Sequence, residues 1–156
     1  MHFDPVDVKT PTDKQYAGLQ VGGEISAVVI LRGGVALENG LKRVIPDCIT
    51  SRILIQTSWR TGEPELHFTS LAEELRNHKR VLILDSQMSS GGAALMAVRV
   101  LIDHGVKENR IVFVTFMAGK HGLNRLMSVY PEIKVVVCRV VDDLEVRWVE
   151  QRYLGC

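Results

Sequence analysis

The stretch VLILDSQMSSGGAA, residues 81–94, decides the fold class of this chain. An apolar run is followed by Asp85, then by a loop of small residues, and then by an alanine-rich segment. This order is typical of a buried strand, a short loop and a helix in an α/β protein. Residues 81–84 are continuously apolar, without alternation, which indicates a strand that is covered on both faces.

The same alternation of strand and helix extends from this stretch in both directions. Apolar, β-branched runs predict strands at 25–31, 52–56, 81–84, 111–115 and 134–140. Helices are predicted from a capping-box pattern at 70–73, over 93–104 before Gly105, and over 122–130 before Pro131. We therefore expect an α/β fold with a central, mainly parallel sheet flanked by helices.

Two segments fall outside this alternation. Residues 1–24 are polar and rich in turn formers, and they predict an extended lead-in. Residues 57–68 join the turn-rich TSWRTGEPE to LHF, which predicts a hairpin or a flexible loop. Because the chain has 156 residues and no internal repeat, we expect a single domain over residues 1–156.

Composition and charge exclude several classes of protein. Nineteen basic and 18 acidic side chains leave a net charge of +1, which argues against a nucleic-acid or membrane-surface protein. The apolar runs are far shorter than the roughly 20 residues that span a bilayer. Cys48, Cys138 and Cys156 are widely spaced and form no CxxC pair, so neither a disulfide scaffold nor a metal site is expected. This cysteine usage favours a reducing compartment, and we expect the cytoplasm, with the nucleus as the alternative.

The 81–94 stretch also carries the chemistry that the sequence predicts. In a parallel sheet, ligands gather at the carboxyl ends of the strands, where Asp85 would lie. The Ser-Ser-Gly-Gly loop offers closely spaced backbone amides at a helix N-terminus, which favours an anion such as phosphate. The alternative is an ordinary strand-to-helix turn with a solvated acid. Neither a Walker loop nor GxGxxG is present, which argues against ATP hydrolysis and dinucleotide binding.

These residues resemble a known family. Residues 85–93 read DSQMSSGGA and are similar to the DPMLATGGS loop that binds phosphoribosyl pyrophosphate (PRPP) in type I phosphoribosyltransferases. The segments VKTP (8–11), ILRGG (30–34), ILIQ (53–56), TGEPEL (61–66) and AVRVLIDHGV (97–106) match in the same order. The wider chain therefore resembles the uracil phosphoribosyltransferase family, including the C-terminal domain of uridine kinase-like proteins.

The resemblance implies a reaction and a set of roles. Uracil N1 would attack C1 of PRPP as pyrophosphate leaves, giving UMP, with Mg²⁺ held through PRPP. Asp85 and Arg32 are the residues implied in catalysis, Asp85 at the ribose hydroxyls and Arg32 at the pyrophosphate. The PRPP-binding set is Arg32, Asp85, Ser86, Gln87, Met88, Ser89, Ser90, Gly91, Gly92 and Ala93. The base-binding set is Ala118, Gly119, Trp148, Val149 and Glu150. A homodimer and a uridine kinase-type partner are also implied.

Two differences from the family pattern keep a second function open. Many members carry a PRPP-binding arginine where this chain has Thr57, and Arg60 either reaches the same anion or is a surface charge. Near the C-terminus, the glycines that would contact uracil are replaced by Trp148 and Glu150. The alternatives are thus a pyrimidine-salvage enzyme and a catalytically degenerate domain that works as a regulatory or protein-interaction module. A flavodoxin-like or Rossmann-like nucleotide binder would explain the strand-helix order but not the matching segments.

Overall fold

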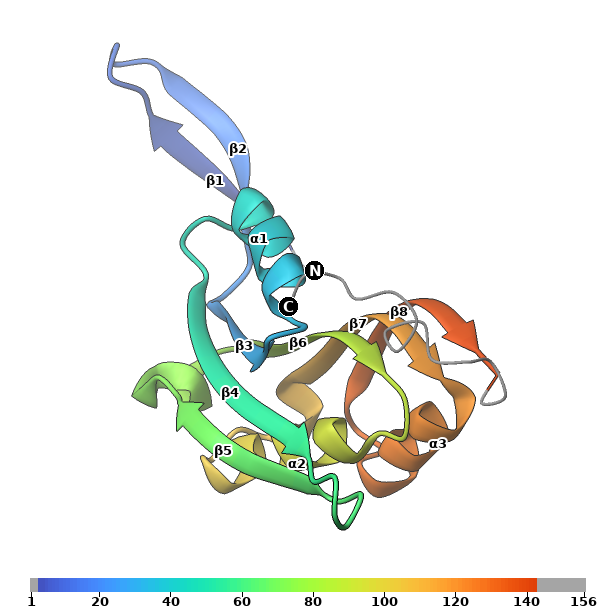
Figure 1. The fold of residues 1–156 in the computed structure, drawn as a ribbon. Helices are drawn as coiled ribbons and strands as arrows, with labels where there is room; N and C mark the ends of the chain where they lie inside the picture. The colour runs from blue at the N-terminus through green and yellow to red at the C-terminus, as the bar shows by residue number, and fades with distance from the viewer. Residues whose placement is uncertain (1–2, 143–156) are drawn as a thin grey trace.

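The computed structural model describes residues 3–142, which form an α/β sheet domain and a projecting hairpin (Figure 1). The six-stranded sheet has the order β5-β4-β3-β6-β7-β8. Its strands are β3 (Ile25–Leu31), β4 (Ile49–Thr57), β5 (Pro64–Ser70), β6 (Arg80–Met88), β7 (Ile111–Gly119) and β8 (Lys134–Val141). All neighbouring pairs are parallel except β4 and β5. The predicted central, mainly parallel sheet is therefore confirmed.

Helices cover the two faces of the sheet unequally. Helices α2 (Gly92–Asp103) and α3 (Lys120–Val129) pack on one face, over a large core that includes Phe113 and Ile83. Helix α1 (Val35–Val44) packs on the other face, over a smaller core built around Val29 and Leu84. Parallel strands are usually covered on both sides, but within residues 3–142 α1 leaves part of the second face without a helix.

The five predicted strands are all present, and β6 continues to Met88, beyond the predicted end at residue 84. The predicted hairpin over 57–68 is confirmed by antiparallel pairing of β4 with β5. The capping-box prediction at 70–73 was wrong, because Ser70 is the last residue of β5 and pairs with Arg52. Only a short 3₁₀ helix, η1 (Glu73–Asn77), follows it.

Helix α1 was not predicted from the sequence. Its Asn39-Gly40 pair is typical of a turn, and glycine costs a helix about 1 kcal/mol relative to alanine. The helix forms because Leu37 and Leu41 pack against the sheet, and Arg52 donates to both carboxylate oxygens of buried Glu38 at 3.0 and 3.2 Å. Tertiary contacts thus outweigh local propensity in this helix.

The lead-in is a β-hairpin rather than a single extended segment. Strands β1 (Phe3–Lys9) and β2 (Gln15–Val21) pair antiparallel, with Phe3 opposite Val21. The hairpin projects away from the sheet domain (Figure 1).

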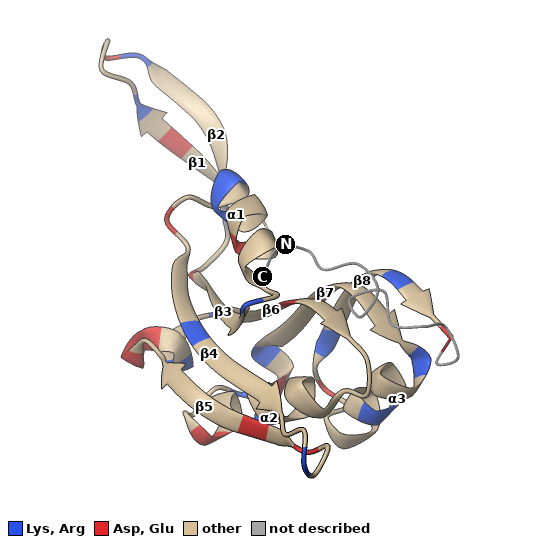
Figure 2. Ribbon diagram, in the orientation of Figure 1, with Lys and Arg blue, Asp and Glu red and all other residues tan. Residues whose placement is uncertain are grey.

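A second short 3₁₀ helix, η2 (Glu108–Arg110), precedes β7. No helix among residues 3–142 is long and apolar enough to span a membrane. Basic and acidic residues are interspersed over the elements (Figure 2).

Candidate active site at the carboxyl edge of the sheet

Strands β3, β6 and β7 are neighbours and parallel, so they end at the same edge of the sheet. The turn at Arg32, the loop that follows β6 and the β7–α3 junction at Gly119 therefore lie at one edge. Strand β3 continues into α1 on one face, whereas β6 continues into α2 on the opposite face. Such a switch between neighbouring strands opens a crevice at their carboxyl ends, and ligands of α/β sheets bind there.

Asp85 lies on β6 just past the end of its pairing with β3. Leu84 is the last β6 residue that pairs with β3, whereas Asp85 still pairs with Thr115 of β7. The space beside Asp85 is taken by the turn after β3, since a Cβ on Gly33 would come within 2.8 Å of Asp85 Oδ1 and 2.7 Å of Ser86 Oγ. A side chain at residue 33 would therefore displace the carboxyl group from its position.

The Asp85 carboxyl is electrostatically unusual. Burial raises its pKa to about 7, and hydrogen bonds from the backbone amides of Gln87 and Ser86 offset only part of this effect. Near neutral pH the group is thus divided between its acid and carboxylate forms. Perturbed acids of this kind are concentrated at functional sites, although burial alone also produces them.

The 89–93 loop presents backbone amides that have no partner within the described chain. Leu95 N is the first amide of this region that donates to a backbone carbonyl, to Gly91 O at 2.9 Å. Among residues 3–142, no side chain caps the N-terminus of α2, and no hydrogen bond is recorded for the Ser90, Gly91 or Gly92 amides. Gly91 adopts a left-handed conformation, with φ of 80°, which lets successive amides turn toward one side.

Two contacts from other elements hold this loop in place. A Cβ on Gly122, in the first turn of α3, would lie 2.1 Å from Ser89 O. A Cβ on Gly92 would touch the ring of Pro64, the first residue of β5, at 3.4 Å. The loop is therefore enclosed between the start of α3 and the β4–β5 hairpin. The contacts of Gly122 and Pro64 were not predicted, because a single sequence carries no signal for which two distant segments touch.

The predicted cationic residues lie at the same edge but are exposed. Arg32 follows β3 directly, after a cis peptide bond between Leu31 and Arg32, and its side chain reaches solvent. Arg60 lies in the loop between β4 and β5, with its guanidinium 5.5 Å from the centroid of the Trp59 ring. Thr57 is the last residue of β4, so this loop also starts at the carboxyl edge.

The predicted base-binding residues are only partly described. Ala118 and Gly119 are buried at the end of β7, next to Met88 and Val141 of the adjacent strands. Trp148, Val149 and Glu150 lie outside the described residues. The structure thus brings Arg32, residues 85–93 and residues 118–119 to one edge, and it leaves the tail part of the set untested.

Three comparisons identify the family. The sequence model of the family described as uracil phosphoribosyltransferase matches residues 1–151. Uracil phosphoribosyltransferase of Dictyostelium discoideum is 34% identical over 152 residues, covering 97% of this chain and 68% of that protein. Mouse uridine-cytidine kinase-like 1 is 36% identical over 146 residues, covering 91% of this chain and 26% of that protein. The chain thus spans about a quarter of this kinase-like relative and about two thirds of the transferase.

Solved structures share the fold of this chain. The structure of the AQ2163 protein from Aquifex aeolicus superposes with a TM-score of 0.81 at 25% identity, over 93% of this chain and 68% of that chain. A purine phosphoribosyltransferase from Pyrococcus horikoshii has a TM-score of 0.56 at 17% identity, covering 80% of this chain and 78% of that one, which shows the shared type I fold. On the matched family and the transferase relative, this chain belongs to the uracil phosphoribosyltransferase family.

Proposed function

We propose that the carboxyl edge binds PRPP and transfers its phosphoribosyl group to uracil, giving UMP and pyrophosphate. The observation that carries this proposal is the combination of a buried acid, Asp85, with the amides of Ser90, Gly91 and Gly92 on the loop that follows it, which have no hydrogen-bond partner within residues 3–142. A sugar phosphate needs both kinds of group: an acceptor for its hydroxyls and a set of donors for its phosphate oxygens.

In this proposal each part of the edge meets one part of PRPP. The 89–93 loop and the start of α2 bind the 5′-phosphate, and Asp85 accepts hydrogen bonds from the ribose hydroxyls. Arg32 meets the pyrophosphate with its planar set of donors, and Mg²⁺ arrives bound to the pyrophosphate oxygens. The base lies against residues 118–119 at the end of β7, where the predicted tail residues Trp148, Val149 and Glu150 complete its pocket.

The chemistry then depends on position and charge. The bond between uracil N1 and ribose C1 forms as the bond from C1 to the pyrophosphate oxygen breaks. The electron pair of the broken bond leaves with pyrophosphate, and the N1 proton passes to solvent water. Positive charge develops on the ribose ring beside Asp85, and negative charge develops on the pyrophosphate beside Arg32. Fixed groups of the opposite sign at these two places lower the barrier without a covalent intermediate.

Calorimetric titration with PRPP and Mg²⁺, followed by a uracil-dependent pyrophosphate-release assay, tests the proposal. We expect binding and release in the native protein, and loss of both in the double variant Asp85→Ala/Ser90→Ala. The exposed pair Asp47→Ala/Ser128→Ala changes the same residue types away from the edge and serves as the control. Unchanged PRPP affinity in the Asp85/Ser90 variant, together with a native circular dichroism spectrum, would show that the site is wrongly assigned.

One observation favours a second function, a regulatory module that keeps the sugar-phosphate site. Thr57 stands at the end of β4 where the family pattern has an arginine, so one anion contact depends on exposed Arg60 instead. PRPP binding without pyrophosphate release would support the regulatory function over the enzymatic one. Loss of binding in Arg60→Ala would show that the loop replaces the missing arginine.

We further propose that the chain acts as a homodimer in the cytoplasm, alongside a uridine kinase-type partner. The projecting hairpin exposes Tyr16 and Leu19, at 64% and 71%, which gives it apolar surface for a second copy. Cys48 and Cys138 are free thiols, as a reducing compartment requires. Relatives named as kinases share most of this chain, which supports such a partner. Light scattering measures the dimer, and a monomer at micromolar concentration would contradict it.

A further inference from the structure

Among residues 3–142, no helix lies over one half of the α1 face of the sheet. Along β8, Val135 and Val137 pack toward α2 and α3, so the alternate residues face the other way. These alternate residues include Val136, which is 52% exposed and lines the space beside α1, and Cys138, which is also exposed. Phe116 on neighbouring β7 is 52% exposed. Parallel sheets are usually covered on both faces, so an exposed apolar strip of this kind is a candidate interaction surface.

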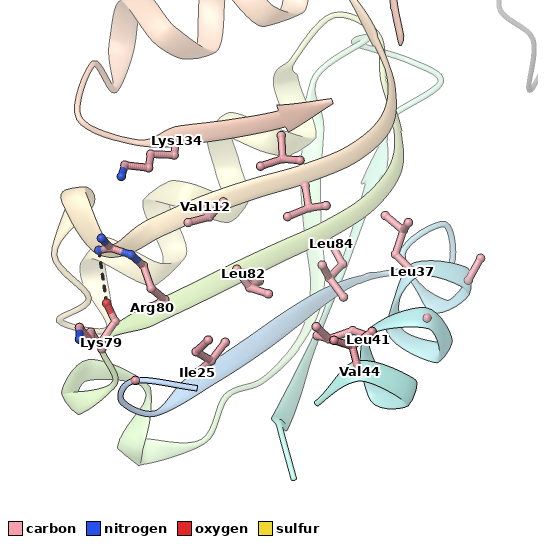
Figure 3. Close-up of a pocket in the computed structure, with 15 residues that line it drawn as sticks. Ile25, Leu37, Leu41, Val44, Lys79, Arg80, Leu82, Leu84, Val112 and Lys134 are labelled. Carbon is pink, nitrogen blue, oxygen red and sulfur yellow. Dashed lines mark hydrogen bonds between the residues drawn. The ribbon is translucent and has the colours of Figure 1, made fainter. Parts of the chain in front are cut away.

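A groove runs between this strip and helix α1. Its volume is about 810 Å³. The floor consists of apolar residues of four parallel strands, and the wall is the adjoining face of α1 (Figure 3). The floor residues are Ile25, Leu82, Leu84, Val112, Val114 and Val136, and the main wall residues are Leu37, Leu41 and Val44. Two helices on one sheet face normally lie 8–10 Å apart, so the space beside α1 has the position of a missing neighbour.

The groove is cationic at one end. Lys79, Arg80 and Lys134 line it at the amino ends of β6 and β8, and Figure 3 shows their side chains together at that end. Within residues 3–142, no carboxylate lies within 4 Å of any of the three. Arg80 donates instead to backbone carbonyls, and the nearby Glu24 carboxylate faces His78 at 3.4 Å. None of the three side chains is therefore ion-paired within the described part of the chain.

We propose that this groove docks an amphipathic helix of a partner polypeptide, lying beside α1 with its C-terminal end at Lys79, Arg80 and Lys134. The apolar floor and wall receive the apolar face of the helix. The cationic end selects its direction, because the C-terminus of a helix carries partial negative charge and acidic residues in its last turn add to it. The partner helix then runs in the same direction as α1, which also ends at the amino edge of the sheet.

Cys138 supplies a direct readout, because it lies on the strip and is exposed, whereas Cys48 is buried. In the full-length chain with Cys156→Ser, the rate at which a thiol reagent labels Cys138 reports whether the strip is covered. The probes are two stapled peptides of about 16 residues with one leucine face. One carries glutamates in its last turn, and its twin has the same composition with the glutamates in the first turn. We expect the first peptide to bind about 10-fold more tightly and to slow Cys138 labelling.

Matched variants distinguish binding in the groove from nonspecific binding to apolar surface. Val136→Asp in the groove should abolish peptide binding, whereas Val129→Asp on α3, where valine is similarly exposed at 54%, should not change it. Lys134→Glu should remove the preference for the first peptide, whereas Lys14→Glu on the distant hairpin should keep it. Equal binding of the two peptides, or binding that leaves Cys138 unprotected, overturns the proposal.

Two further outcomes would assign the groove to another occupant and so also overturn it. If Cys138 labelling slows with protein concentration in the absence of peptide, a second copy of this chain covers the strip. If deletion of residues 143–156 speeds the labelling of Cys138 in the absence of peptide, and peptide binding is not weakened, the chain's own tail is the occupant.

Discussion

The carboxyl edge and the α1 face of the same sheet are built in opposite ways. At the carboxyl edge, backbone meets backbone so closely that an added methyl group has no room, as at Gly34, where a Cβ would lie 2.2 Å from Leu84 O. On the α1 face, an open groove of about 810 Å³ runs beside the helix, over strands that the helix does not cover. Small residues therefore fix the geometry of the candidate active site. The groove, in contrast, has room for added side-chain volume as long as no partner fills it.

Gly34→Ala is expected to have the largest effect on stability. The new methyl group would collide with the backbone of β6 and with Ile30 O, neither of which can rotate away. We expect a loss of about 4 kcal/mol or more in the free energy of unfolding, or no folded protein at all. Urea denaturation measures it. A variant within 1 kcal/mol of the native protein, roughly the ordinary effect of a substitution, would show that the edge can relax.

The two faces can be compared by truncation. Phe113 is fully buried on the α2 and α3 face, so Phe113→Ala should cost about 3–4 kcal/mol. Val136 is 52% exposed in the groove, so Val136→Ala should cost less than about 0.5 kcal/mol. Thermal denaturation of both variants gives the difference. Similar losses in the two variants would mean that the groove is filled in the isolated protein.

Asp85→Asn examines the acid at the carboxyl edge. The pKa of Asp85 is about 7 in the folded chain and near 4 in the unfolded chain, so only the folded chain holds this proton between those values. Its contribution to stability therefore falls as pH rises from about 4 to about 7. We expect the asparagine variant to be more stable than the native protein by about 1–3 kcal/mol at pH 8, and by less at pH 5. An equal difference at both pH values would contradict the raised pKa.

Gly40→Ala is the smallest effect and the control for Gly34→Ala. Gly40 lies inside α1, the helix that begins directly after Gly34, and lines the groove; a Cβ there would meet nothing within 4 Å. Replacing a helical glycine with alanine should therefore stabilise the protein by about 0.5–1 kcal/mol. A destabilised Gly40→Ala variant would mean that the groove is narrower in solution.

The sequence predicted the strands because their apolar runs are continuous and bounded by turn formers, as residues 111–115 illustrate. It did not predict α1, since the pair between Glu38 and Arg52 that supports this helix joins residues on separate elements. The capping box at Ser70 failed for a related reason: Ala72 N donates to Ser51 Oγ at 3.0 Å, and β5 keeps Ser70 extended. Local patterns thus predict elements well only where long-range contacts agree with them.

The candidate site divides in the same way. Asp85 and the 89–93 loop are adjacent in sequence, so one motif indicated all of them. The contact of Gly122 with Ser89 O depends on how α3 is placed by β7, which no local pattern encodes. Residues at the ends of separate parallel strands, such as Arg32 and Ala118, could be grouped only through the expected topology.

The titration of Asp85 near neutrality has a thermodynamic consequence for any ligand that needs its carboxylate. Near pH 7 part of the free protein carries a proton on this group, and engagement of its carboxylate form by sugar hydroxyls would release that proton to the buffer. Heats of binding would then vary with the ionisation enthalpy of the buffer, and their slope between Tris and phosphate would count the protons displaced.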